Sequence, residues 1–178
     1  MENLEALKFP IGDFVPPKDT SSGMRSHWIE DIAHLPSQLR TAVVGLSEEQ
    51  LETPYRPGGW TVRQVVHHIP DSHMNSYMRF RLALTEDNPT IRPYEEQLWA
   101  ELPDAAHGEI DLSLDLLEML HKRWVVLLKA MSEEDYQRTF VHPASGKTSR
   151  LATVLAMYSW HGRHHLAHIT ELKKRMGW

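Results

Sequence analysis

The stretch 151–176 constrains the fold most, because its apolar residues recur every three or four positions. That spacing predicts one long amphipathic helix. Continued at the same spacing, the apolar stripe reaches His161, then His165, then His168 or Ile169. Imidazoles therefore occupy positions where core side chains are expected. Residues four apart lie on the same helix face, about 5–6 Å apart at Cβ, so His161 and His165 can hold one ion between them.

Three other segments show helical spacing of apolar residues: 23–45, 61–85 and about 111–131. Four such helices predict an all-α fold, a four-helix bundle with long connecting loops. A length of 178 residues favours one domain that spans 1–178.

Two prolines lie inside the predicted helices. Pro36 is expected to divide or bend the first helix, and Pro70 to bend the second directly beside His68, because proline removes a helical hydrogen bond. Thr61, followed three residues later by Gln64, predicts a capping box at the start of the second helix.

The connections are read from their prolines and glycines. Residues 1–21 predict an extended N-terminal arm. Residues 87–108 form a long connection with at most one helical turn, at 94–101, and connections of this length are uncommon unless functional. Residues 141–148 indicate a turn, with a hairpin as the alternative. We find no convincing β pattern in the chain.

A third metal ligand is sought on the second helix, where His67 and His68 are adjacent but point about 100° apart. His68 lies on the polar flank nearer the core. We therefore predict that His68, His161 and His165 are the metal ligands. A hydrogen-bonded cluster of core histidines without metal is the competing interpretation.

The predicted ligand set limits the chemistry. Because the chain has no cysteine, its metal ligands must be nitrogen or oxygen atoms. Three protein ligands leave one position free, which is typical of a catalytic site. We expect one divalent ion per subunit, zinc in the first place and nickel as the alternative, that lowers the pKa of a bound water or thiol.

Four residues near these histidines are weaker candidates. Asp71 and Asn75 could orient an imidazole or a substrate, although capping and solvation explain them equally well. Arg79 could recognise a carboxylate, against the alternative of a surface ion pair. His164 either lies next to a ligand or faces solvent.

The charge balance argues against two classes of partner. With 19 basic and 24 acidic residues, the net charge of -5 provides no positive surface for nucleic acid or an anionic membrane. The N-terminus lacks the pattern of a signal peptide, and no apolar run is long enough to span a bilayer. We expect a soluble cytoplasmic protein that acts on a small molecule.

Four motifs together resemble those of the DinB-like superfamily, and within it the YfiT-type metal-dependent hydrolases, which include bacillithiol S-transferases. They lie at 55–68, 71–77, 88–99 and 160–170. The resemblance implies a four-helix bundle, a zinc or nickel ion on His68, His161 and His165, and a cytoplasmic homodimer. This chain departs from the family pattern at Pro70, two residues after His68.

Two reactions are consistent with this reading. If the ion activates water, the outcome is hydrolysis; if it activates a low-molecular-weight thiol such as bacillithiol, the outcome is S-transfer to an electrophile. The alternative from another class is a non-catalytic metal-binding or dimeric interaction module.

Overall fold

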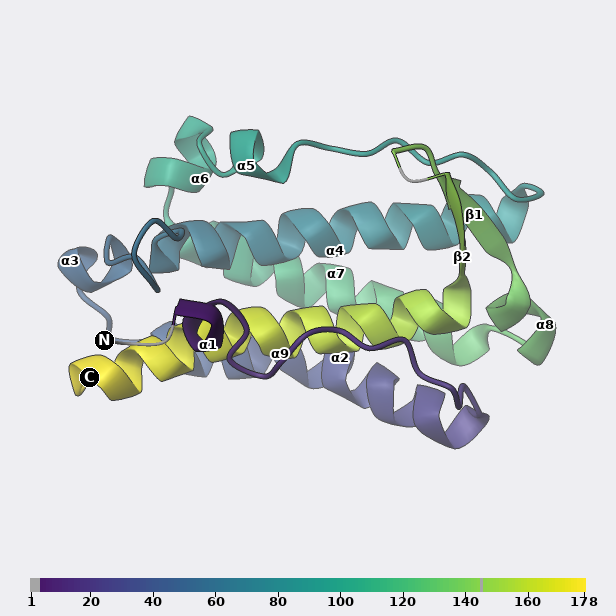
Figure 1. The fold of residues 1–178 in the computed structure, drawn as a ribbon, viewed down its shortest axis with the longest axis horizontal. Coiled ribbons are helices and arrows are strands. Elements are labelled where there is room, and N and C mark those ends of the chain that lie inside the picture. Colours follow the sequence, from purple (N-terminus) through teal and green to yellow (C-terminus); the bar gives the residue numbers. More distant parts are fainter. Residues whose placement is uncertain (1–3, 145) are drawn as a thin grey trace.

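Four long helices run side by side in a computed structural model that describes residues 4–144 and 146–178 (Figure 1). They are α2 (Ser22–Val43), α4 (Val62–Thr85), α7 (Ile110–Ala130) and α9 (Leu151–Met176). Both α2 and α4 pack against α7 and α9, so α2 and α4 stand at opposite corners. The predicted four-helix bundle is confirmed.

Seven short elements complete the described chain: α1 (Leu4–Lys8), α3 (Glu48–Leu51), α5 (Glu96–Trp99), α6 (Pro103–His107), α8 (Glu133–Gln137), β1 (Thr139–His142) and β2 (Lys147–Arg150). The described part of the N-terminal arm lies along α9 (Figure 1), which it contacts through the carbonyls of Lys8 and Gly12. The arm was expected to be extended, but α1 makes part of it helical. The long connection contains α6 as well as the expected turn at α5, and both pack against α4.

At 139–150 the structure has the hairpin that the sequence offered as the alternative to a simple turn. β1 and β2 pair antiparallel from Thr139 with Arg150 to His142 with Lys147. Val141 also exchanges backbone hydrogen bonds with Pro89 and Ile91, at 2.9 and 3.0 Å, so the strand is tied to the long connection. Strands of four residues carry little periodicity, and partners distant in the sequence stabilise them.

The helix starts follow the capping signals, whereas the prolines do not break the helices. Thr61 and Gln64 form both halves of the predicted capping box, with bonds of 3.2 and 3.0 Å. α2 is helical through Pro36 and α4 through Pro70. Of the two outcomes expected at Pro36, division of the first helix is therefore wrong, and a bend stays a prediction there as at Pro70.

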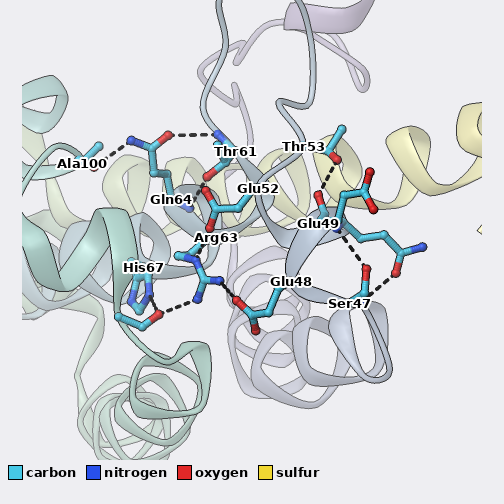
Figure 2. A network of polar contacts seen from close by, with 12 residues as sticks. Ser47, Glu48, Glu49, Glu52, Thr53, Thr61, Arg63, Gln64, His67 and Ala100 are labelled. Carbon is cyan, nitrogen blue, oxygen red and sulfur yellow. Dashed lines mark hydrogen bonds and ion pairs between the residues drawn. The ribbon is translucent and has the colours of Figure 1, made fainter.

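A buried arginine fixes the start of α4. Arg63 is 4% exposed; its Nε donates to Glu52 at 2.6 Å, its Nη1 donates to the Gly108 carbonyl at 2.7 Å, and its Nη2 pairs with Glu48 (Figure 2). A buried guanidinium requires such partners. These bonds join α3 and the α6–α7 junction to α4, one turn before its two adjacent histidines.

The apolar core is divided into two clusters by a layer of histidines. One cluster includes α4 up to Ile69 and α9 from Ile169 onward. The other includes α4 from Tyr77 onward and α9 up to Tyr158. The histidines of this middle layer are His68, His73, His121, His161, His164, His165 and His168. None of the described helices is both long and apolar enough to cross a lipid bilayer.

The helices α2 and α9 approach closely at Gly162. A Cβ atom at this position would lie 2.5 Å from Leu35 Cδ2, and the Leu35 side chain is itself in the core. Gly162 follows His161 directly. The contact with Leu35 therefore determines how closely this part of α9, with its histidines, approaches α2.

We expect Gly162→Leu to lower the free energy of unfolding by about 1–3 kcal/mol through overpacking. For a chain of this size, each kcal/mol corresponds to roughly 2–4 °C in Tm, measured by circular dichroism. Gly23→Leu in α2 is the matched control, because a Cβ there meets nothing within 4 Å. Equal melting temperatures for the two variants would contradict the close packing.

Candidate metal centre

Three histidines from two helices converge in the middle layer. His68 of α4 and His161 and His165 of α9 each offer one ring nitrogen, and these nitrogens all lie within 4.8 Å of one another. The structure thus brings together the three residues predicted as ligands.

The spacing of the nitrogens suits a tetrahedral ion. His68 Nε2 and His161 Nε2 are 3.3 Å apart. Two nitrogens at Zn–N distances of 2.0–2.1 Å in tetrahedral geometry are separated by about 3.3–3.4 Å. The pair therefore needs little movement to bind a common ion.

The protonation state of the cluster also fits a metal. Burial lowers the pKa of His68 to about 4 and holds the pKa values of His161 and His165 well below the ordinary histidine range. Neutral imidazoles keep a free lone pair. His165 Nδ1 is buried without a hydrogen-bond partner in the described part of the chain. A divalent ion would compensate for the burial of these polar groups.

His67, the neighbour of His68, has a different role. Its Nε2 donates to the Gly108 carbonyl at 3.2 Å, and its Nδ1 lies 2.7 Å from Ser113 Oγ. Both ring nitrogens are thus occupied in joining α4 to the start of α7. Trp60 packs against the His68 ring, with 4.5 Å between centroids, and limits its movement.

At His161 the cluster borders a cavity of about 480 Å³ between α4, α9, the long connection and the β1–β2 hairpin. His161, Ser72, Tyr158, Tyr94 and Arg79 line this cavity. Ser72 Oγ lies 3.4 Å from His161 Nε2 and donates to the Tyr158 hydroxyl at 3.5 Å. Burial raises the pKa of Tyr94, which keeps its phenol protonated. Hydroxyl groups therefore surround the accessible side of the cluster.

Of the weaker candidates, only Arg79 lines this cavity. Its Nε is buried without a hydrogen-bond partner among the described residues. Burial and the nearby Asp104 of α6 raise the pKa of Asp71 to about 6, and Asn75 donates to the Asp71 backbone carbonyl at 2.9 Å. Neither side chain has a hydrogen bond to the cluster in the described structure.

His164 is buried rather than exposed, on the side of α9 that faces the N-terminal arm. Its ring stacks on Trp160 with 4.5 Å between centroids and lies 6.0 Å from the ring of Phe9. Burial lowers its pKa to about 4. It contacts the His165 ring edge but forms no hydrogen bond with the cluster in the part of the chain described.

Sequence reasoning missed two histidines behind the cluster. His73 Nε2 lies 3.2 Å from His161 Nδ1, and His73 Nδ1 lies 2.9 Å from His121 Nε2. Both are almost completely buried. The available signal was the position of His121 on the apolar stripe of α7, between Leu117 and Trp124.

Comparison with known proteins points to one family. The family model described as DinB superfamily matches residues 31–169. A Bacillus cereus (strain 03BB102) protein named "Putative metal-dependent hydrolase" is 56% identical over 172 residues, which cover 97% of this chain and 98% of that protein. A Bacillus anthracis protein with the same name, from strain A0248, is also 56% identical over 172 residues, with the same coverage of both chains.

A solved structure has the same fold. YfiT from Bacillus subtilis, described as a probable metal-dependent hydrolase with an unusual four-helix bundle topology, superposes with a TM-score of 0.95 at 48% identity. The match covers 97% of this chain and 99% of the other.

We expect His68→Ala to lower the affinity for a divalent ion by more than about 100-fold, because changes outside the ligand set already cost 10–100-fold. His67→Ala is the matched control, since it removes the adjacent buried histidine. Zinc and nickel content by mass spectrometry, together with competition against a chelator, measures the difference. Metal loss in His67→Ala and retention in His68→Ala would reverse the assignment.

Proposed function

This chain belongs to the DinB superfamily, and on that premise we propose that it is an enzyme in which His68, His161 and His165 hold one divalent ion. Zinc is the first expectation and nickel the alternative. One observation carries the proposal: the three nitrogens converge, and the same cluster opens onto a cavity. Its volume of about 480 Å³ is within the range of small-molecule sites.

A divalent ion at this position would supply Lewis-acid chemistry, lowering the pKa of a water or thiol at its open side. The side chains around it would orient the reacting group. Ser72 and Tyr158 can each donate or accept a hydrogen bond beside His161. The buried rings of the cluster exclude bulk water from the opposite side.

Two reactions fit this arrangement. Activation of water leads to hydrolysis, which the names of the relatives support. Activation of a low-molecular-weight thiol such as bacillithiol leads to S-transfer, which rests on the resemblance in the motifs. The same ligands and cavity serve both.

Arg79 supports the view that the substrate carries an anionic group. It lines the cavity with His161, Glu95 and Glu96, and neither glutamate nor any other carboxylate in the described chain forms an ion pair with it. A guanidinium with free donors binds a carboxylate or phosphate in a bidentate manner. We assign Arg79 to substrate binding.

A homodimer in the cytoplasm is part of the same proposal. The outward side of α7 supports it, because Leu112, Leu116, Met119 and Val126 are exposed at helical spacing. Such a row on one helix is suited to a second copy of the chain.

Assays of the zinc-loaded and nickel-loaded protein test the function. One arm is a panel of esters and amides, and the other is bacillithiol with a generic electrophile. We expect turnover in one arm, loss of it on chelation, and recovery when the ion is restored. A protein that binds the ion tightly but turns over nothing in either arm would support the non-catalytic module instead.

Arg79→Met should raise KM for the accepted substrate by at least about 10-fold with a smaller change in kcat, because the lost contact binds an anionic group away from the reacting atoms. Arg81→Met is the control, since Arg81 lies on the same helix and donates to the Tyr77 hydroxyl at 3.0 Å, outside the residues that line the cavity. An unchanged KM for Arg79→Met would exclude this role.

A further inference from the structure

The hydrogen bonds behind the cluster have a single possible direction, which starts at a backbone carbonyl. His121 Nδ1 lies 2.6 Å from the Ile32 carbonyl oxygen. In a regular helix this carbonyl accepts from the N–H of residue 36, but residue 36 is proline and has none. The Ile32 carbonyl is therefore available to His121, and because a carbonyl only accepts, His121 Nδ1 must carry the proton.

This direction then passes from ring to ring. A neutral imidazole has one donor and one acceptor nitrogen, so the Nε2 of His121 is an acceptor. It lies 2.9 Å from His73 Nδ1, which must donate. His73 Nε2 is in turn an acceptor, 3.2 Å from His161 Nδ1. His161 therefore carries its proton on Nδ1, and its Nε2 keeps the lone pair.

The Nε2 atom of His161 is the one that faces His68 Nε2 in the cluster. We propose that His121 and His73 form a histidine relay, anchored on the Ile32 carbonyl, that fixes the tautomer and orientation of His161 for metal binding. This inference rests on the proposed metal site. His73 and His121 are positioning residues, because neither offers a nitrogen to the ion.

The relay connects all four long helices. It begins on α2 at Ile32, continues through α7 and α4, and ends on α9 at His161. Burial supports neutral rings along its length, since it lowers the pKa of His121 to about 4 and the pKa values of His73 and His161 well below the ordinary range. A ligand nitrogen prepared in this way needs no reorientation when the ion binds.

The first test reads the tautomers directly. Two-bond 15N–1H correlation spectra of the wild-type protein, metal-free and zinc-loaded, distinguish protons on Nδ1 from protons on Nε2. We expect Nδ1–H for His121, His73 and His161 in both forms. A proton on Nε2 of His73 or His121 would overturn the relay without any variant.

The second test measures zinc affinity by chelator competition. We expect His121→Phe and His73→Phe each to weaken zinc binding by about 10–100-fold, the usual cost of losing a partner of a metal ligand. His121→Gln should recover most of the loss, because an amide can donate to Ile32 and accept from His73.

His67→Phe is the matched control. It also replaces a buried histidine that donates to a backbone carbonyl, but one without a hydrogen bond to the cluster. Its zinc affinity should equal that of the wild type. Wild-type affinity in His121→Phe, or equal losses in His121→Phe and His121→Gln, would contradict the relay.

The two proposals fail in different ways. If the wild-type protein binds neither zinc nor nickel, the proposed metal site is wrong, and the tautomers of the metal-free protein still decide whether the hydrogen bonds run as described. If the wild type binds zinc and the relay variants bind it equally well, the site stands and the relay is rejected.

Discussion

The structure depends on keeping uncharged imidazoles inside a helical bundle. A buried imidazole is costly unless its polar nitrogens find partners. Several of these rings donate to a backbone carbonyl: His67 to Gly108, His121 to Ile32 and His168 to Lys8. Gly108 lies between α6 and α7, Lys8 is the last residue of α1, and Ile32 lies four residues before Pro36. At each of these positions a regular helical donor is missing. The bundle therefore supplies acceptors where its own backbone pattern is interrupted.

The candidate metal cluster of His68, His161 and His165 differs from these anchored rings, because none of its three rings donates to a backbone carbonyl in the described structure. The nitrogens of His68 and His161 face each other, and His165 Nδ1 is buried without a partner in the described structure. On the inner side, packed rings and the hydrogen bond from His161 to His73 restrict movement. On the outer side the long connection leaves a cavity. A rigid inner side and an accessible outer side are what a metal-dependent enzyme requires.

Local signals in the sequence predicted the elements that carry the cluster. The capping box at Thr61 and the apolar spacing of 151–176 set the helix register, and register places His68, His161 and His165 on inward faces. Predictions based on proline alone were weaker: the helix at Pro36 is not divided, and the freed Ile32 carbonyl accepts a hydrogen bond from His121. The β1–β2 hairpin was foreseen only as an alternative, since its pairing also depends on residues 89–91.

The sequence by itself determined which faces of the helices are buried and that the four helices form a bundle, because periodicity is a property of neighbouring residues. The buried faces in turn indicated the three histidines that converge. Tertiary structure alone decided how His73 and His121 join that centre and which side of it remains open. Those features depend on which helices meet at which depth, as at Gly162 against Leu35, and helical spacing within one segment carries no information about that contact.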